Sequence, residues 1–534
     1  MQEQSSNAKK SNMGRRFFLG ATTGVIGLGI KTLLNIIVYP YILQTLGVEQ
    51  YGLYVLLLNI ADLIILMDLG LTSGIIQRLS TFKAAQENNP DCAVSRQATH
   101  QLLSTGLVLY AVLAILSFLI AFSLVPLVPN FFNLNAELSA IASFTLYIVL
   151  LESALTLFQG YFASVLMSHN LHQWVNTGES LYFITANGCI FILLHMGYGL
   201  REIALLRLGA ATIKFLLVFS HAVRHEPDCI KPTYFNFHKA IDLLKVSVHA
   251  MIRTVSDIFA NRMDLIIIGR MLSLRDVATL EFVYRFFNII LQIPTQITLG
   301  IFPVFTRMIA LGNHTQARLV FLRLSCFLQV IVSILIAVLC IFYPEIFKFF
   351  SGGRIDYQAT IPLLILAIPG VISTAVYLPA SHYLFAAGRF KLISGGSVFI
   401  AILKVVLVLM LIKPMGLLGV VLSTFIIDII YHQILLIRQS CKDLSIGFWE
   451  YSKDVHLINI PVLLAATAAI YGLKQAFALM SLHPMLQAVL ATFIMLPAAM
   501  IAWFLMSATQ EEKAICQTAL SRVLLHRPGR VRSV

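Results

Sequence analysis

The chain has 534 residues, of which 58% are hydrophobic and only 12% are charged. A soluble globular domain carries about 25% charged residues, so this composition excludes a soluble protein and indicates an integral membrane protein. The net charge of +13 would suit a nucleic-acid-binding protein. The Lys and Arg residues do not gather in one basic domain, however, and we predict no nucleic-acid partner.

Apolar segments follow one another along nearly the whole chain. About fourteen of them are long enough to cross a hydrocarbon core of about 30 Å as helices. In chain order the predicted spans are 17–40, 52–78, 102–126, 138–166, 177–198, 202–223, 241–269, 276–306, 320–344, 360–386, 391–413, 416–438, 456–475 and 484–506. The sequence therefore predicts an all-α integral membrane protein with about 14 transmembrane helices.

Basic residues alternate between successive connections. Lys10, Arg15 and Arg16 precede the first span, whereas the connections 44–50 and 126–137 contain no Lys or Arg. This distribution follows the positive-inside rule. It predicts a multi-pass protein of the plasma membrane with both termini in the cytoplasm.

Weak internal symmetry indicates two related halves. One gapless displacement of the chain lays Asn35 on Asn261 and Asn59 on Arg285. Inverted or parallel repeats of this kind are typical of secondary transporters. The predicted order is a cytoplasmic tail at 1–16, an N-terminal six-helix lobe at 17–225, a cytoplasmic linker at 226–240, a C-terminal six-helix lobe at 241–440, an extra helix pair at 441–506 and a basic cytoplasmic tail at 507–534.

Five basic residues lie inside predicted spans. Each costs about 2.5–3.5 kcal/mol at the centre of a membrane helix, which indicates a function for them. They are Lys31, Arg253, Arg262, Arg285 and Lys404. Two of them, Arg253 and Arg285, have an acid one helical turn away, so local pairing is the alternative to substrate contact. The other three have no acid at that spacing, although a partner on another helix stays open.

Depth singles out Lys31 among these bases. At 1.5 Å per residue from Phe17, it lies roughly 21 Å into the helix, too far to reach the cytoplasmic surface by snorkelling. Asn35 follows one turn later, and Asn261 lies on the polar stripe of the seventh span. We predict that these two amides and the five bases form a cationic substrate-binding cavity.

Four acids inside the spans are candidates for binding a coupling proton or Na⁺. They are Asp62, Asp257, Asp264 and Asp428. Ionisable groups in membrane helices commonly serve such gradients. The alternative is that each acid only pairs with a nearby cation.

Two further polar features are weaker candidates for the substrate-binding cavity. Glu152 is a minor cavity candidate in the fourth span. Arg207, Lys214 and His221 form a stripe in the sixth span, which we interpret as structural because two of them lie near its ends. The seven cysteines show no C-x-x-C spacing, so neither a zinc site nor a disulfide framework is indicated. We predict no metal, cofactor or catalytic residue.

Short motifs resemble a known family. The segment 46–54, followed by 68–71 and Gln77-Arg78, is similar to the opening of the bacterial polysaccharide (O-antigen type) flippases. These belong to the multidrug/oligosaccharidyl-lipid/polysaccharide exporter (MOP) superfamily. The stretch from Asp264 to Arg307 resembles the second lobe of the same family.

The resemblance implies a fold and a function. The fold is a V-shaped pair of six-helix lobes that work by alternating access. The function is export across the bacterial inner membrane of an undecaprenyl-diphosphate-linked oligosaccharide, as in O-antigen, lipopolysaccharide or exopolysaccharide biosynthesis, without enzymatic activity. The implied partners are that lipid-linked oligosaccharide, membrane lipids, a coupling proton or sodium ion, and a glycan polymerase with a chain-length regulator. Arg and Lys suit a diphosphate because they hold phosphate oxygens through charge-assisted hydrogen bonds.

Two alternatives and one departure accompany this interpretation. A multidrug or small-solute exporter of the same superfamily is the first alternative, and bases without local acids argue against it. A membrane glycan polymerase or ligase is the second, and the short outside connections argue against it. The eleventh span carries Ser394, Ser397 and Lys404 on one face. It lacks the acids that coordinate sodium in some related flippases, which argues against sodium coupling.

Overall fold

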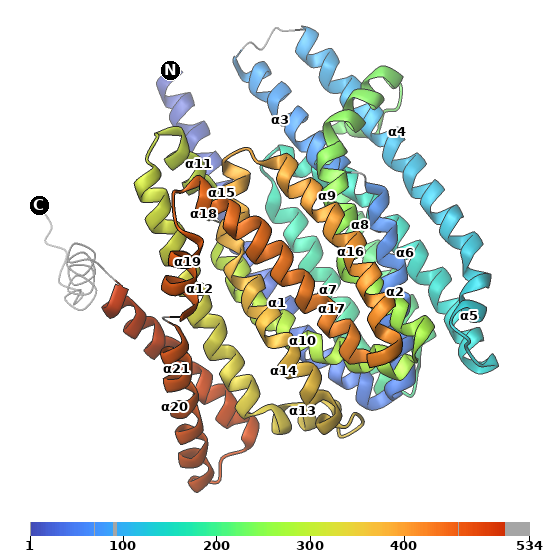
Figure 1. Ribbon diagram of the computed structural model, residues 1–534. Coiled ribbons are helices and arrows are strands. Elements are labelled where there is room, and N and C mark those ends of the chain that lie inside the picture. Colours follow the sequence, from blue (N-terminus) through green and yellow to red (C-terminus); the bar gives the residue numbers. More distant parts are fainter. Residues whose placement is uncertain (1, 69, 89–92, 299, 458, 508–534) are drawn as a thin grey trace, which may run out of the picture. The chain divides into compact units, whose positions relative to one another are not determined.

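The computed structural model describes residues 2–68, 70–88, 93–298, 300–457 and 459–507. Within these ranges, the side chains of 2–21, 25–26, 65–66, 83–88, 93–96, 246–250, 253, 257, 261, 499 and 501–507 are not described. Every element in the described part is a helix (Figure 1). The prediction of an all-α membrane protein is therefore confirmed.

Eleven helices are long and apolar enough to cross a membrane among the residues described. They correspond to eleven of the predicted spans. The other three predicted spans do not recur as single long apolar helices. The span 52–78 is interrupted by a short 3₁₀-helix, and 241–269 carries several charges. The span 484–506 contains a shorter apolar helix at 484–498. The count of fourteen is therefore not confirmed.

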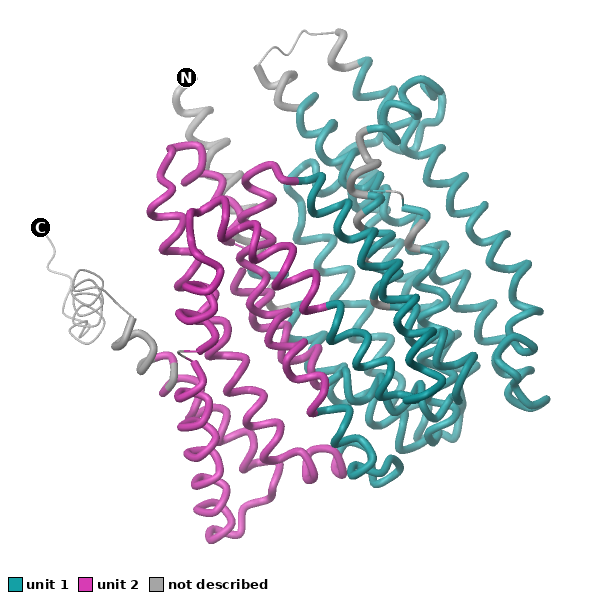
Figure 2. The backbone as a smooth tube through the Cα atoms, viewed as in Figure 1, with its two compact units in different colours: residues 1–285, 350–364, 390–427 teal, residues 286–349, 365–389, 428–534 magenta. Residues whose placement is uncertain are grey.

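The chain forms two compact units, which Figure 2 shows in different colours. Unit 1 comprises residues 1–285, 350–364 and 390–427, and unit 2 comprises 286–349, 365–389 and 428–534. These units do not follow the boundaries predicted for the two six-helix lobes. The lobes, as a functional division, stay a prediction.

Unit 1 contains most of the first half of the chain together with two helices from the second half. Its elements are α1 (Gln2–Leu46), α2 (Val48–Asp62), η1 (Leu63–Asp68), α3 (Leu71–Asn88), α4 (Ala93–Leu124), η2 (Val125–Leu127), α5 (Val128–Phe131), α6 (Ala136–Ser168), α7 (His172–His195), α8 (Leu200–His225), η3 (Pro227–Ile230), α9 (Phe237–Met271), the first half of α10 (Leu274–Thr298), the start of α14 (Tyr357–Val376), α16 (Phe390–Met415) and α17 (Leu417–Asp428). The main helix pairs are α1 with α7, α6 with α8, α7 with α8, and α9 with α16.

Local sequence explains where several helices begin. Asn135 precedes α6, and its side chain accepts a hydrogen bond from the Leu138 amide at 2.8 Å. Asn236 caps α9 in the same way, with the Lys239 amide at 3.2 Å. Such caps satisfy amides that the first helical turn leaves without partners.

A break interrupts the second predicted span. The tight-helical segment η1 ends at Asp68, whose carboxylate accepts hydrogen bonds from the Tyr110 hydroxyl at 2.5 Å and the Thr72 hydroxyl at 2.9 Å. Gly70 then adopts a φ of 72°, a left-handed conformation that favours glycine. Asp68 therefore holds the start of α3 against α4.

The linker after α8 docks on unit 1. The Tyr161 hydroxyl on α6 lies 3.0 Å from the Leu103 carbonyl oxygen and 2.8 Å from that of Cys229 in η3. Ser104 on α4 donates to the Lys231 carbonyl at 2.5 Å. These bonds hold the linker against α4 and α6.

Unit 2 contains the remaining helices. They are the second half of α10, α11 (Ile301–Ala310), α12 (His314–Ile341), most of α13 (Tyr343–Ser351), the rest of α14, α15 (Leu378–Ala386), η4 (Ile429–Ile437), α18 (Arg438–Asp443), α19 (Phe448–Tyr451), η5 (Ser452–Leu457), α20 (Asn459–Leu479) and α21 (Pro484–Ser507). The segments η4 and η5 are π-helical.

The last two helices pack on α12. A buried cluster joins Val330, Ile334 and Phe342 with Ala466 and Ile470. At the end of the pair, the Lys474 ammonium lies 2.7 Å from a Glu345 carboxylate oxygen and donates to the Ile341 carbonyl at 2.8 Å. The extra helix pair is thus joined to unit 2 by apolar packing and one ion pair.

Close packing of α2 against the start of α10 generates a first prediction. A Cβ atom at Gly52 would overlap the carbonyl oxygen of Leu274, a backbone atom that cannot rotate away. We expect Gly52→Ala to destabilise the protein by about 1–3 kcal/mol, the usual range for overpacking. The measurement is thermal unfolding of the purified protein in detergent.

Gly188→Ala is the matched control, because nothing lies within 4 Å of a Cβ built at that helical glycine. Equal unfolding temperatures for the two variants would contradict the close approach at Gly52.

Candidate functional site

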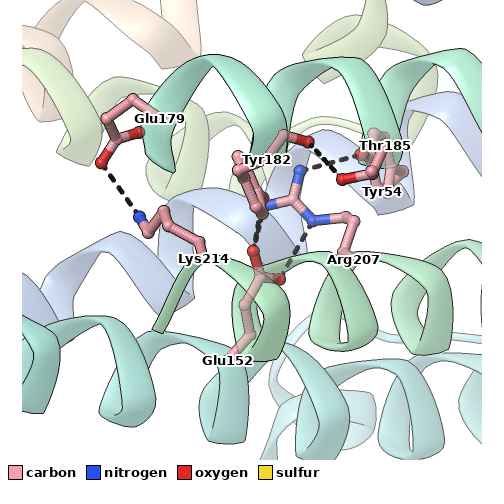
Figure 3. A network of polar contacts seen from close by, with 7 residues as sticks. All are labelled: Tyr54, Glu152, Glu179, Tyr182, Thr185, Arg207 and Lys214. Carbon is pink, nitrogen blue, oxygen red and sulfur yellow. Dashed lines mark hydrogen bonds and ion pairs between the residues drawn. The ribbon is translucent and has the colours of Figure 1, made fainter. Parts of the chain in front are cut away.

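A buried ion pair lies at the centre of unit 1. Glu152 on α6 and Arg207 on α8 form a two-pronged contact: Arg207 Nε donates to Glu152 Oε2 and Arg207 Nη2 donates to Glu152 Oε1, both at 3.0 Å (Figure 3). The Glu152 side chain is only 6% exposed. Burying either charge alone would be very unfavourable, so the pair holds α6 and α8 in one register.

Two tyrosines complete this pair. The Tyr182 hydroxyl on α7 donates to Glu152 Oε1 at 2.5 Å, and Arg207 Nη1 donates to the Tyr54 hydroxyl on α2 at 3.3 Å. Figure 3 shows Tyr182 and Arg207 converging on the Glu152 carboxylate, with Tyr54 beside the Arg207 guanidinium. The network therefore joins four helices of unit 1, namely α2, α6, α7 and α8.

A second pair lies beside the first. Lys214 on α8 contacts Glu179 on α7 at 3.0 Å (Figure 3), and its ammonium lies 5.2 Å from the centre of the Tyr182 ring. The Lys214 side chain is buried, whereas that of Glu179 is 46% exposed. This pair therefore extends from the buried network to the surface of the protein.

Aromatic rings connect the network to Arg285. The Arg285 guanidinium lies 3.4 Å from the centre of the Tyr39 ring, and the Tyr39 and Tyr54 rings are 6.5 Å apart. Arg285 Nη2 also donates to Glu281 at 2.7 Å, which is the local pair that the spacing predicts. Its Nε atom is buried and has no hydrogen-bond partner among the described residues. A donor in that position is suited to an oxygen that the protein does not itself supply.

Lys31 differs from the other bases. Its side chain on α1 is exposed, and its ammonium lies 4.8 Å from the centre of the Phe183 ring on α7. Within the described part of the chain it has no acidic partner. Asn35, one turn further along α1, is half-buried.

Arg262 and Lys404 have partners on other helices, which helical spacing did not reveal. Arg262 on α9 contacts Asp62 at 2.9 Å, and the pair is about half exposed. Lys404 on α16 contacts Asp264 on α9 at 2.8 Å, and these two side chains are 6% and 5% exposed. Both contacts place a predicted substrate-binding base against a predicted ion-coupling acid.

The remaining predicted site residues are distributed as follows. Asp428 belongs to unit 2 and takes part in none of the contacts described above. The side chains of Arg253, Asp257 and Asn261 lie outside the described residues, although their backbones belong to α9. No group of three His, Cys, Asp or Glu side chains suited to a metal ion occurs in the part that the structure describes.

The Glu152–Arg207 network is the feature that sequence reasoning undervalued. In the sequence alone the acid is a weak candidate and the base is part of a structural stripe, because their partners lie on different helices. The available signal is that they are opposite charges inside two predicted spans, the fourth and the sixth. Nothing in the sequence marks Tyr54 or Tyr182 as their partners.

Comparisons with known proteins agree on family and fold. A family model described as "Polysaccharide biosynthesis protein" matches residues 20–309. One similar solved structure is an inward-facing multidrug resistance MATE family transporter of the MOP superfamily, with 13% identity, a TM-score of 0.64, and 79% of this chain and 98% of that chain covered. Another is the lipid II flippase MurJ in an inward closed conformation, with 14% identity, a TM-score of 0.62, and 88% and 97% covered.

A MOP superfamily transporter from Pyrococcus furiosus is also similar, with 13% identity, a TM-score of 0.55, and 82% of this chain and 97% of that chain covered. No curated protein matches the chain. The chain therefore has the fold of the MOP superfamily transporters, and these structural matches are to transporters and a flippase rather than to enzymes.

The buried Lys404–Asp264 pair generates a second prediction. Lys404→Met leaves the Asp264 carboxylate buried without its cation, and such a loss costs about 3–5 kcal/mol. We expect the double variant Lys404→Met with Asp264→Asn to recover most of that stability, because neither charge remains. Thermal unfolding in detergent measures both.

If the double variant were as unstable as Lys404→Met alone, the two charges would not be coupled as the 2.8 Å contact requires.

Proposed function

Because the chain belongs to the polysaccharide biosynthesis protein family, whose model matches residues 20–309, we propose that it is a flippase for a lipid-linked oligosaccharide. The substrate is an undecaprenyl-diphosphate-linked glycan repeat unit of the O-antigen, lipopolysaccharide or exopolysaccharide type. It moves across the bacterial inner membrane by alternating access between two six-helix lobes. Both termini lie in the cytoplasm, as the positive-inside pattern predicts.

Lys31 is the observation that carries this proposal. An exposed ammonium far inside a membrane helix, without an acidic partner among the described residues, is stabilised best by a ligand that brings negative charge. A diphosphate supplies that charge and several acceptor oxygens. The Phe183 ring beside the ammonium attracts the cation weakly and leaves its hydrogen-bond donors available for phosphate.

Arg285 and Arg262 support the same substrate in different ways. The buried Arg285 Nε has no partner in the described part of the protein and offers one donor to a phosphate or sugar oxygen. Arg262 is held by Asp62 in a half-exposed pair. A phosphate can replace the Asp62 carboxylate there without burying a new charge. The proposed substrate-binding set remains Lys31, Asn35, Arg253, Asn261, Arg262, Arg285 and Lys404.

Lys404 is the residue of that set least available for direct contact with the substrate. Its ammonium is buried between Asp264 and the Ala260 carbonyl, so both contacts would have to break before it met a substrate. We propose that it acts through the position of α9 rather than by direct contact.

Export of drugs or small solutes is the principal alternative, because the same fold includes multidrug transporters. A glycan polymerase or ligase is less favoured, since both the fold and the family point to transport. A glycan polymerase and a chain-length regulator are proposed partners downstream of export.

A deletion strain tests the function directly. We expect lipid-linked repeat units to accumulate on the cytoplasmic leaflet and surface glycan to disappear. Normal surface glycan in a deletion strain without a second flippase would exclude the proposal, and increased drug sensitivity with normal glycan would favour the exporter.

Substitution of Lys31 tests the site. A hydrogen bond to a charged group contributes about 1.5–3 kcal/mol, and 1.4 kcal/mol corresponds to a factor of ten. Lys31→Ala should therefore lower the flipping rate of the complemented strain by about tenfold or more at unchanged membrane abundance, while Lys31→Arg retains most of it. Lys413→Ala, which removes an exposed lysine at the end of α16, is the matched control. Full activity of Lys31→Ala would remove Lys31 from the site.

A further inference from the structure

Unit 2 contains a partly buried polar cluster that the proposed substrate site does not use. It consists of Gln329 on α12, Asp428 at the end of α17, His432 and Gln433 on η4, and His456 on η5. We call these five residues the histidine cluster. Ionisable side chains inside a membrane protein are costly, and chains of Asp and His residues often carry protons.

His432 is a buried base that faces a carboxylate. The residue is 7% exposed, and its ring stacks on the Tyr377 ring with centroids 3.9 Å apart. Its Nδ1 atom lies 3.8 Å from Asp428 Oδ1 and has no hydrogen-bond partner among the described residues. That separation is too long for a hydrogen bond but short for an attraction between opposite charges. A proton on Nδ1 would create that attraction.

Helix α14 approaches Asp428 closely. A Cβ atom at Gly370 on α14 would lie 2.7 Å from Asp428 Oδ2, so a larger residue there would have to displace the carboxylate. Sodium in proteins needs several oxygen ligands around it. Here one side of the carboxylate is closed by α14 and another faces an imidazole, which suits a proton better.

His456 has partners for either protonation state. Its Nδ1 lies 2.7 Å from Gln329 Oε1, and its Nε2 lies 3.3 Å from Gln433 Oε1. Gln433 Nε2 donates to the Ser373 hydroxyl at 3.2 Å, and that hydroxyl donates to the Asp428 carbonyl oxygen at 3.4 Å. The Gln433 oxygen therefore faces His456. With both ring nitrogens facing carbonyl oxygens, the arrangement fits an imidazolium. If the Gln329 amide turns over, its NH₂ group donates to Nδ1 and a neutral ring is equally satisfied.

Both histidines lie on π-helical segments. His432 and Gln433 belong to η4, and His456 belongs to η5. A π-helix is rare, is frequent at functional sites, and differs from an α-helix by one residue in its hydrogen-bond pattern. It can therefore adopt a second backbone arrangement, which is what a switch driven by protonation requires.

Tyrosines and α14 surround the two rings. Around His432 the titratable groups are Asp428, Tyr377 on α14 and Tyr431, whose ring centroid lies 5.6 Å away. His456 meets the edge of the Tyr451 ring with centroids 5.9 Å apart. Tyrosine stays neutral across the physiological range, so the two histidines and Asp428 are the proton-exchanging side chains of this cluster.

We propose that the histidine cluster is the site at which this transporter binds its coupling proton. The proton binds to His432 Nδ1, where Asp428 stabilises the resulting imidazolium. Gln433 follows His432 on η4 and contacts His456, so a change at His432 reaches His456 through Gln433. The inference deepens the proposed function, since it names the ion and the site that power export. A proton on His432 cancels the negative charge of Asp428 at the end of α17. A conformation that holds these two side chains together therefore binds the proton more tightly than one that separates them.

A binding measurement tests the site without any substrate. Purified full-length protein in weakly buffered detergent is taken through a pH jump from 8 to 5, and proton uptake is read with a pH-sensitive dye. We expect His432→Gln to take up fewer protons per molecule than wild type, and Asp428→Asn to shift the uptake by His432 to lower pH. His221→Gln is the control for loss of one histidine from unit 1, where that ring stacks on Trp174. If His432→Gln and wild type take up equal amounts, the site is excluded.

A transport measurement tests the coupling. Proteoliposomes with a lipid-linked oligosaccharide are given either a proton gradient or a sodium gradient. We expect the proton gradient to accelerate wild-type flipping about tenfold, and His432→Gln and His456→Gln to keep only the rate seen without a gradient, while His221→Gln behaves as wild type. Acceleration by sodium alone, or an undiminished proton effect in His432→Gln, would overturn the proposal. A third outcome separates the two proposals. If no condition gives flipping but His432→Gln still loses the proton uptake, the proposed substrate is contradicted and the proposed proton-binding site is supported.

Discussion

In a low-dielectric interior an ionised carboxylate or guanidinium persists only beside an opposite charge, and the Glu152–Arg207 contact meets this requirement where four helices of unit 1 converge. Because Tyr182 donates to Glu152 and Arg207 donates to Tyr54, the pair joins α2, α6, α7 and α8. The rings of Tyr39 and Tyr54 extend this arrangement to Arg285. The bases proposed to meet substrate are therefore held on a rigid framework rather than on loops.

The sequence predicted the helices well and the contacts between them poorly, for a physical reason. Length and hydropathy are local properties, so eleven of the predicted spans recur as helices that could cross a membrane. Partner choice for Lys404 and Arg262 depends on which helices pack side by side. Asp264 contacts Lys404 because α9 packs on α16, and Asp62 contacts Arg262 because α9 packs on α2. The pairing of Arg285 with Glu281 was predictable because one helical turn joins them.

Burial separates bases that the sequence treated alike. Lys404 and Asp264 are both almost fully buried, so their attraction is strong and their exchange with solvent or substrate is slow. Arg262 and Asp62 are partly exposed, where an ion pair contributes little and its partners exchange readily. Lys31 has no acidic partner among the described residues, and its ammonium lies beside the Phe183 ring. The order of availability to an anionic substrate is thus Lys31, then Arg262, then Lys404.

The Glu152–Arg207 pair and the histidine cluster differ in how they respond to a proton. Arginine stays charged at any physiological pH, so Arg207 in unit 1 remains a cation beside Glu152. Histidine changes charge near neutrality, and the histidine cluster in unit 2 places two such rings on backbone segments with an alternative hydrogen-bond pattern. The proposed mechanism uses both kinds of group: permanent cations to bind the proposed diphosphate, and a titrating group to bind the proposed coupling proton. In this chain the proposed division of labour follows the two compact units, because each set of contacts is closed within its own unit.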